Sequence, residues 1–368
     1  MSLSSKEFRF TAKPGEVPTM PASVPSAMNP LAPEGLSEVY RLVEGDLDSV
    51  AGIIRNRLRH SNPVVDEILR YSFKLGGKRL RPLLLLLVAR VCGGIKKEHL
   101  CAAAALEMIH TGTLVHDDIL DGARFRRHLE TINLRWDSQF AVLAGDLLLT
   151  KAISLITEFA DQESYRVIAD ACRKTCEGEL LQVSFRGRFD MTLDDYWTII
   201  DGKTASLIEV SCRLGTFFSG SSKERGNGDL DGIFAGFGRN LGLAFQIFDD
   251  ILDLVGSSDV TGKTLGTDLL NQKPTLPLIH YLETAGSRNR EEMLLVLSRS
   301  GFGERDAVWV KEVLERSGAV EHARRHAFGL VAEASALLEP FAESGDPDRR
   351  EAALALKKVA QFVVDRNT

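Results

Sequence analysis

The sequence Asp-Asp-Ile-Leu-Asp occurs twice in this chain, as Asp117–Asp121 and as Asp249–Asp253, each time within apolar sequence of helical character. Residues four apart in an α-helix lie on one face, so the first and last carboxylates of each pentad point the same way. Burying such like charges together is unfavourable unless cations neutralise them. Mg²⁺ is the natural candidate, because it usually binds through one or two carboxylates together with substrate phosphates. Two facing pentads would therefore bind magnesium ions around a diphosphate.

The rest of the chain, from about Leu36 onward, has the pattern of one helix after another. Leu80–Val91, His99–Leu120 and Ile233–Val255 are rich in apolar residues and good helix formers, and alternating strand patterns with hairpin turns are missing. Helices that are apolar almost all round are typical of the middle of a large bundle. The sequence therefore predicts an all-α fold, a large single-domain helical bundle around a deep central cavity that contains the carboxylates. Further helices are predicted at 39–50, 64–73, 140–159, 165–186, 205–219, 276–282, 291–297, 306–317, 319–338 and 349–364.

Residues 1–35 have a different character, because six prolines interrupt Ser, Ala, Met and Thr without any apolar periodicity. Such a segment buries too little surface to offset the entropy of ordering it. We therefore expect a flexible Pro-rich tail at 1–35 and one folded domain at 36–368. The tail lacks the apolar core of a secretory signal, and Glu7 and Glu16 argue against an organelle transit peptide. The apolar run Leu83–Val88 is too short to span a bilayer.

Charge and cysteine content narrow the range of partners and locations. The formal net charge of -6 argues against nucleic-acid binding, because an acidic excess repels phosphate backbones. The five cysteines form no CxxC pair and lie mostly in apolar, helical sequence. They are expected to be buried thiols in a reducing compartment, which makes the cytoplasm the expected location.

A set of basic residues complements the acidic pentads. Gly76–Pro82 places three cations behind two glycines, just before a predicted helix, where the backbone and the helix start favour anions. Arginine forks and lysine point charges are how proteins bind phosphate. Further polar residues lie near the pentads or in a second basic loop, which runs from Gly262 to Lys273. They are His110, Arg126, Arg127, Lys203, Thr204, Gln246, Lys263, Asp268 and Lys273.

Each motif taken alone has a simpler explanation. A single DDxxD is usually a solvated helix face or an N-terminal cap. A Gly-Lys-Arg cluster is commonly a surface turn, and a lone His110 would most often be an internally hydrogen-bonded histidine. The repeated pentad inside apolar helices resists this kind of explanation, because it makes the fold harder to stabilise.

In this combination the chain resembles the trans-isoprenyl diphosphate synthases of the polyprenyl synthetase family. The resemblance runs from about Leu36 to Arg366 and is carried by Gly76–Pro82, Leu114–Asp121, Arg126–Arg127, Ala144–Asp146, Lys203–Thr204, Phe245–Asp250 and Gly262–Asp268. It implies that residues 36–368 form the catalytic domain of a Mg²⁺-dependent prenyltransferase. Such an enzyme condenses isopentenyl diphosphate with an allylic diphosphate to give a longer all-trans polyprenyl diphosphate. The resemblance also implies a homodimer, and the apolar product suggests loose membrane association.

The resemblance assigns a role to each motif residue. Three Mg²⁺, for which Mn²⁺ could substitute, would be ligated by Asp117, Asp121 and Asp249, with Asp118, Asp250, Asp253 and Asp268 completing or orienting the site. The allylic diphosphate would be held by Arg126, Lys203, Lys263 and Lys273. Isopentenyl diphosphate would be bound by Lys78, Arg81, His110 and Arg127, with Gly77 giving backbone access. Thr204 and Gln246 would stabilise the allylic cation, so the catalytic set is Asp117, Asp121, Asp249, Lys203, Thr204 and Gln246.

The chain departs from the family pattern at two places. Gly122 follows the first pentad where the family often has an acidic residue, and His128–Glu130 replaces a commoner Gly-Lys-Pro turn. Neither departure touches an assigned ligand, so we expect altered loop packing and retained chemistry.

Product length should depend on Gly112 and Thr113, which lie five and four residues before the first pentad, about 7 Å along a helix. In relatives with short products an aromatic side chain at this level blocks the growing chain, whereas both residues are small here. We therefore expect a medium or long product of about C25 to C50. Two alternatives remain: small residues can simply allow close helix packing, and Phe159 or Phe140 could close the pocket and give a farnesyl or geranylgeranyl product.

Three other functions compete with this interpretation. Class I terpene cyclases share the all-α fold and one DDxxD, but usually carry a different second metal motif and do not bind isopentenyl diphosphate. A regulatory subunit of a heteromeric synthase would commonly lack the aspartates, and all six are present here. A catalytic subunit that needs a partner is the third.

Overall fold

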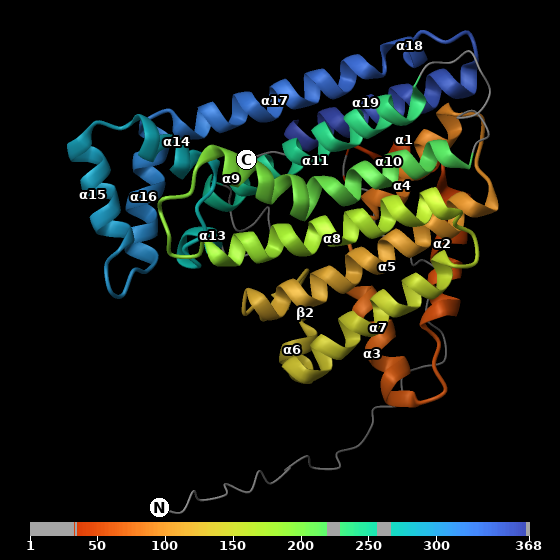
Figure 1. Ribbon diagram of the computed structural model, residues 1–368, viewed down its shortest axis with the longest axis horizontal. Helices are drawn as coiled ribbons and strands as arrows, with labels where there is room; N and C mark the ends of the chain where they lie inside the picture. Colours follow the sequence, from red (N-terminus) through yellow and green to blue (C-terminus); the bar gives the residue numbers. More distant parts are fainter. Residues whose placement is uncertain (1–32, 34, 219–228, 256–265, 366–368) are drawn as a thin grey trace, which may run out of the picture.

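The computed structural model describes residues 33, 35–218, 229–255 and 266–365, and almost all regular structure within them is helical (Figure 1). The predicted all-α class is therefore confirmed. The Pro-rich tail, Gly262 and Lys263 lie outside the described residues. The helices are α1 (Ser37–Arg41), α2 (Glu44–Leu58), α3 (Pro63–Lys74), α4 (Leu80–Val91), α5 (Lys97–Leu120), α6 (Ile132–Arg135), α7 (Ser138–Ile156), α8 (Gln162–Ser184), α9 (Leu193–Ile200), the π-helix η1 (Asp201–Ala205), α10 (Ser206–Phe217), α11 (Leu230–Val255), α13 (Thr267–Leu270), α14 (Leu276–Thr284), α15 (Ser287–Leu297), α16 (Glu304–Arg316), α17 (Ala319–Leu337), α18 (Glu339–Ala342) and α19 (Pro347–Asp365).

Side-chain caps fix where several helices begin. The Asn62 side chain accepts hydrogen bonds from the N–H groups of Val64 and Val65, with Pro63 at the first helical position of α3. Asp137 and Asp161 cap α7 and α8 in the same way. Such caps satisfy backbone donors that the helix itself leaves unpaired, and each contributes about 1 kcal/mol.

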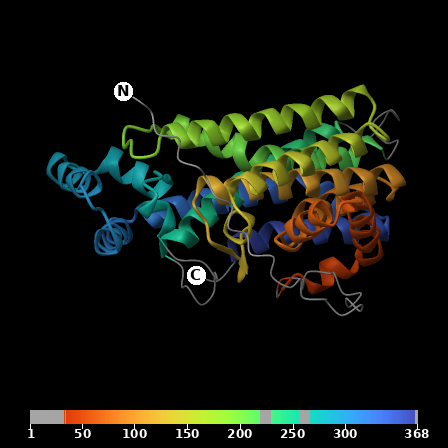
Figure 2. The ribbon, with the colours of Figure 1, turned by 90° about the horizontal axis from the view of Figure 1, so that it is seen from below.

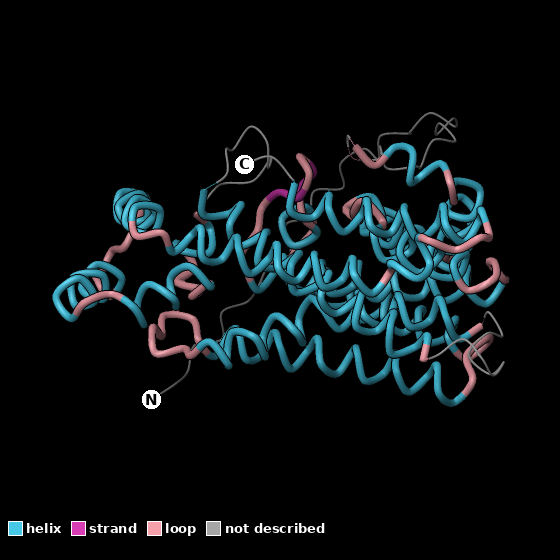
Figure 3. Tube along the Cα trace, turned by 90° about the horizontal axis from the view of Figure 1, so that it is seen from above, coloured by secondary structure: helices cyan, strands magenta, loops and turns pink. Residues whose placement is uncertain are grey.

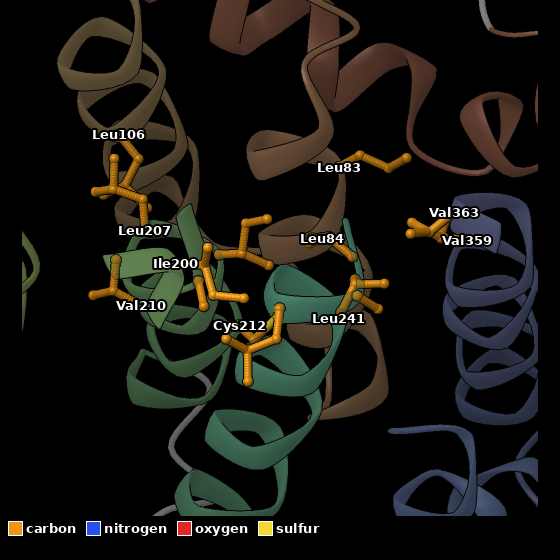
Figure 4. Packing of buried hydrophobic residues seen from close by; sticks show 14 of the residues in the cluster. Leu83, Leu84, Leu106, Ile200, Leu207, Val210, Cys212, Leu241, Val359 and Val363 are labelled. Carbon is orange, nitrogen blue, oxygen red and sulfur yellow. The ribbon is translucent and has the colours of Figure 1, made fainter. Parts of the chain in front are cut away.

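The hydrophobic core lies between the long helices in the middle of the bundle. α5 packs on α7 and α4, while α11 packs on α17 and α10 (Figures 1 and 2). Figure 4 shows the interlocking side chains, among them Leu84 of α4, Leu106 of α5, Leu207 of α10 and Leu241 of α11, which are almost completely buried. The two pentads lie at the C-terminal ends of the central helices α5 and α11. The hydrophobic core around these helices therefore holds both pentads in place.

One short strand pair interrupts the helical structure. β1 (Phe125–Arg126) pairs antiparallel with β2 (Leu129–Glu130), and these strands form a hairpin just after α5 (Figure 3). The expectation that hairpins are missing is corrected to this extent. Arg127 and His128 form the turn, and both have positive φ, 52° and 63°. Two-residue hairpin turns require this geometry, which glycine or asparagine adopts with less strain. Glycine at the position of His128 would therefore adopt this backbone conformation with less strain.

Two surface hollows are found in the described part of the chain, and neither lies at the aspartates. One is lined by residues of α9, α11 and α17, and the other by residues of α1 and α19. The deep central cavity stays a prediction.

Among the described residues, α7 is a candidate for a membrane-spanning helix. By length and composition alone it could span a membrane, with a mean hydropathy of 1.5 over its most apolar window. One such helix is weak evidence, and α7 packs along α5.

Candidate active site at the two aspartate pentads

The first pentad continues the last turn of α5. The N–H of Asp121 donates to the carbonyl of Asp117 at 2.9 Å, so these two residues follow the helical repeat and lie on one face, as predicted. Asp118 lies on another side and is only 3% exposed. Its carboxylate accepts from Arg126 Nε at 3.0 Å and from Nη2 at 2.8 Å. Arg126 therefore balances the charge of Asp118 within the protein.

Two cations already contact Asp121. Lys273 Nζ and Arg186 Nη2 each lie 2.7 Å from its Oδ1 atom. Burial alone would raise the pKa of Asp121, but the attraction of Lys273, Lys203 and Arg186 outweighs burial and lowers it. Arg186 is absent from the predicted site, because it lies 65 residues from Asp121 and belongs to no motif.

The second pentad is joined to the first through α13. Asp253 accepts from Thr267 Oγ1 at 2.5 Å and from the N–H of Asp268 at 2.9 Å, so it caps the start of that helix. Lys273 Nζ then lies 3.9 Å from Asp268 and 2.7 Å from Asp121. The chain of contacts Asp121–Lys273–Asp268–Asp253 brings the two pentads together at one end of the bundle.

Asp250 belongs to a buried hydrogen-bond network. Its carboxylate accepts from Tyr196 Oη and from Gln246 Nε2, each at 2.7 Å, and Gln246 Oε1 accepts from Thr204 Oγ1 at 2.6 Å. Burial and repulsion from Asp268 raise the pKa of Asp250 well above its usual range. Thr204 and Gln246 are thus brought together as predicted. The sequence analysis missed Tyr196, because a tyrosine outside any motif carries no signal.

The π-helix η1 positions Lys203 beside Thr204. A π-turn inserts one extra residue into a helix, and such turns occur frequently at functional sites. Lys203 Nζ lies 2.6 Å from Glu179 and donates to Gln182 Oε1 at 2.7 Å. Burial would lower the pKa of Lys203, but the carboxylates of Asp117 and Glu179 raise it. Glu179 and Gln182 were missed, although two polar residues three apart in the apolar end of α8 could have indicated an inward-facing pair.

The carboxyl group of Asp117 has a raised pKa. Burial raises its pKa to about 6, and repulsion from Glu179 and Asp121 adds to this, while Lys203 and Arg126 oppose it. A carboxyl group in this state releases its proton readily when a metal cation approaches. Asp249, its counterpart in the second pentad, is half-buried at the end of α11.

Two arginines at the start of α4, Arg79 and Arg81, are gathered around one buried acid. Arg79 is 7% exposed and Glu107 of α5 is 1% exposed. Arg79 Nη1 and Arg81 Nε are buried without a hydrogen-bond partner. Burial lowers the pKa of Arg81 to about 10, with attraction from Glu107 opposing it. Two arginines facing one carboxylate leave an excess of positive charge, which an anionic ligand would neutralise. Glu107 lies outside the motifs and was missed.

The other predicted residues of this basic group lie as follows. Burial and repulsion from Arg81, Arg126 and Arg127 hold the pKa of His110 well below its usual value, so its imidazole is neutral. A Cβ atom at Gly77 would lie 3.1 Å from Arg127 Nη2, so glycine leaves room for that side chain. The carbonyl oxygen of Lys78 accepts a hydrogen bond from the Tyr40 hydroxyl. The Nζ atom of Lys78 lies 5.5 Å from the ring centre of Phe362.

The residues predicted to control product length differ in orientation. A Cβ atom at Gly112 would lie 3.1 Å from the Gly145 carbonyl oxygen, so this position faces α7. That contact agrees with the alternative that Gly112 allows close helix packing. Thr113 is half-buried and donates to the His110 carbonyl at 2.8 Å. Phe159 packs edge-to-face on Phe218 near the opposite end of α5.

The donor set fits a hard cation that shares its ligands with a phosphate. Among the described residues, no three His, Cys, Asp or Glu side chains converge closely enough to hold a metal ion by themselves. Mg²⁺ commonly takes only one or two carboxylates and completes its shell with phosphate and water oxygens. The residues present therefore fit Mg²⁺ bound together with a diphosphate.

Comparisons with known proteins identify the family of this chain. The family model described as Polyprenyl synthetase matches residues 62–315. A short chain isoprenyl diphosphate synthase of Methanothermobacter thermautotrophicus is 37% identical over 296 residues, 79% of this chain and 87% of the relative. The octaprenyl diphosphate synthase of Escherichia coli is 32% identical over 325 residues, 88% of this chain and 98% of the relative.

A crystal structure gives the same result. The polyprenyl synthase of Caulobacter crescentus complexed with calcium and isoprenyl diphosphate superposes with a TM-score of 0.82 at 32% identity, covering 90% of this chain and 98% of that one. The chain belongs to the polyprenyl synthetase family, and the resemblance drawn from its motifs is confirmed. It is a prenyltransferase of the trans-isoprenyl diphosphate synthase class.

Proposed function

We propose that this chain condenses isopentenyl diphosphate with an allylic diphosphate, using Mg²⁺, and releases an all-trans polyprenyl diphosphate longer than C20. The observation that carries the proposal is the junction of the two pentads through Lys273. Arg79 at the start of α4 and Arg81 in its first turn, both with a buried nitrogen that has no hydrogen-bond partner, add to it. The residues at the pentad junction suit a metal-bound diphosphate, and the two arginines suit a diphosphate without metal.

The protein residues would act mainly by position and charge. Bound Mg²⁺ would supply Lewis-acid stabilisation of the leaving diphosphate. Lys203, Lys273 and Arg126 would hold that diphosphate as negative charge builds up on it. Thr204 and Gln246, fixed by the bond to Asp250, would present oxygen atoms to the allylic cation. The double bond of isopentenyl diphosphate would attack this cation, and the released diphosphate would take the proton.

The test is a product assay with the purified full-length chain. The enzyme is incubated with Mg²⁺, labelled isopentenyl diphosphate and, separately, C5, C10, C15 and C20 allylic primers, and the products are sized. A ladder that ends beyond C20 supports the whole proposal. A stop at C15 or C20 keeps the chemistry and refutes the product length. No incorporation with any primer contradicts the proposal and points to a missing partner subunit.

Replacing Thr113 with phenylalanine is expected to shorten the product. The half-buried Thr113 lies one helical turn before Asp117, and a ring there would block an extending chain. Product size with a C15 primer is the measurement, and Thr157→Phe at the end of α7 is the control. An unchanged length would remove Thr113 from the product channel.

The Mg²⁺ requirement is expected to rise as the pH falls through about 6. The pKa of metal-free Asp117 is raised from 3.8 to about 6, so its protonated form appears at a higher pH than usual. A proton on this carboxylate competes with the metal, which weakens binding by up to about tenfold per pH unit below the pKa. Half-saturating Mg²⁺, measured from rates between pH 8 and 5.5, should be constant above pH 7 and increase below 6. A flat profile would contradict the assignment.

We further propose that two copies associate through α7 and α8. Large apolar side chains are exposed on both helices, including Leu143 at 65% and Leu180 at 71%. Patches of this kind commonly mark protein–protein contacts. Sedimentation velocity should show a dimer that Leu143→Glu or Leu180→Glu converts to monomer. Leu295→Glu on α15, where the leucine is 73% exposed, should have no effect. A wild-type monomer would refute the dimer.

The cytoplasmic location and the loose membrane association remain predictions.

A further inference from the structure

Three histidines outside the pentad site meet where α14 packs on α17. His322 and His326 lie four residues apart on α17, and their Nε2 atoms are 3.1 Å apart. His280 of α14 stacks on His322, with ring centroids 3.6 Å apart and an angle of 3° between the planes. The proposed reaction uses none of them.

Two Nε2 atoms at 3.1 Å need a positive centre between them. If both were unprotonated, their lone pairs would repel, so either one ring donates an N–H to the other or a cation binds both. Zinc–imidazole bonds are 2.0–2.1 Å long, which places two nitrogens of a tetrahedral site about 3.3 Å apart. The observed separation therefore allows both rings to bind one ion with little movement.

Both rings of the pair can be reached from solvent, because His326 is exposed and His322 is half-buried. Burial lowers the pKa of His322, and repulsion from His280, His326 and Arg325 lowers it further. Burial also lowers the pKa of His280, with His326 and Arg325 contributing and Glu283 opposing. Neutral imidazole is the form that ligates metals.

The pair opens onto a surface groove of about 670 Å³, whose lining includes His322, His326, Trp197, Arg239, Arg325 and Glu333. Glu333 accepts from Asn240 at 3.2 Å, and Arg239 is paired with Asp201. Within the part of the chain that the structure describes, no third His, Cys, Asp or Glu converges with the pair. Two protein ligands would thus be completed by water, for which the groove leaves space.

We propose that His322 and His326 bind one borderline divalent transition-metal ion such as Zn²⁺ or Ni²⁺. Imidazole ligands suit these ions, whereas Mg²⁺ prefers the oxygens of carboxylates and phosphates. Two histidines four apart on one helix face are also the spacing that helical zinc sites use. The protein would then carry two separate metal sites of different chemical type.

The test is calorimetric titration of the untagged full-length chain with Ni²⁺ and, separately, Zn²⁺. The background variant Asp117→Ala/Asp249→Ala removes competing carboxylates, and one equivalent of metal should still bind to it. Adding His322→Ala or His326→Ala should weaken that binding at least about tenfold. His60→Ala, at an exposed histidine before α3, is the matched control and should bind like the background.

A second measurement does not depend on the folding of the variants. Cu²⁺ bound to the unmutated chain should show hyperfine coupling to two equivalent imidazole nitrogens in its electron paramagnetic resonance spectrum. No metal binding to the background variant would overturn the proposal. So would binding that neither His322→Ala nor His326→Ala weakens, in variants whose circular dichroism matches that of the background.

Discussion

Asp117→Ala and Asp249→Ala are each expected to lower kcat/KM at least about a hundredfold. Under the proposed function, each alanine removes a carboxylate that would bind Mg²⁺ at the allylic diphosphate, and metal stabilisation of a leaving group contributes several kcal/mol. A loss of about 1.4 kcal/mol corresponds to tenfold in rate, so a hundredfold loss requires only about 2.7 kcal/mol. Initial rates with labelled isopentenyl diphosphate and a C15 primer measure the effect.

The matched control for these variants is Asp170→Ala on α8. That aspartate is exposed and forms an ion pair with Arg173 at 3.5 Å, so its replacement should leave the rate within about twofold. Near-normal turnover of Asp117→Ala or Asp249→Ala would refute the metal-ligand assignment. Equal losses in all three variants would indicate a general effect on folding.

Lys203→Ala is expected to lower kcat/KM for the allylic substrate by about tenfold to a hundredfold. The lysine is paired with Glu179 at 2.6 Å and is mostly buried, with 17% of its side chain exposed. A hydrogen bond to a charged group contributes about 1.5–3 kcal/mol, which sets the range of the loss. Its removal also leaves Glu179 without its cation beside Asp117, which raises the pKa of Asp117 further.

Two comparisons separate these effects of Lys203. Lys203→Arg keeps the charge and should recover part of the activity, whereas Lys203→Gln should not. The double variant Lys203→Ala/Glu179→Gln removes both charges, so it should regain stability but not activity. Full activity in Lys203→Ala would show that this side chain does not contact the diphosphate.

Patterns among residues that are close in the sequence predicted the helices and motifs on which the site is built. Helical periodicity placed Leu80–Val91 with the bounds found for α4, and the spacing within the first pentad placed Asp117 and Asp121 on one face. The family resemblance assigned Thr204 and Gln246 to the same part of the site, and the structure joins them by a hydrogen bond. These features depend on neighbours along one helix or on motifs with a fixed chemistry.

The supporting residues of the site could not be predicted, because they are set by packing between distant segments. Arg186, Tyr196 and Glu179 each contact a site residue from another helix or loop, and no spacing rule links them to it. The orientation of Gly112 toward α7 likewise depends on the rotation of α5. Helix α9 escaped notice because its eight residues are too few for a clear period.

The π-helix between α9 and α10 has a consequence for how this sequence can change. Deleting one residue from Asp201–Ala205 would restore a regular α-helix, but it would change the directions in which the side chains of this turn point. Lys203 and Thr204 contact different helices, Glu179 of α8 and Gln246 of α11, so they could not both keep their partners after that change. The helix would thus become more regular and more stable, but the site would be disassembled. Insertions or deletions at this turn should therefore be tolerated only where catalysis is not required.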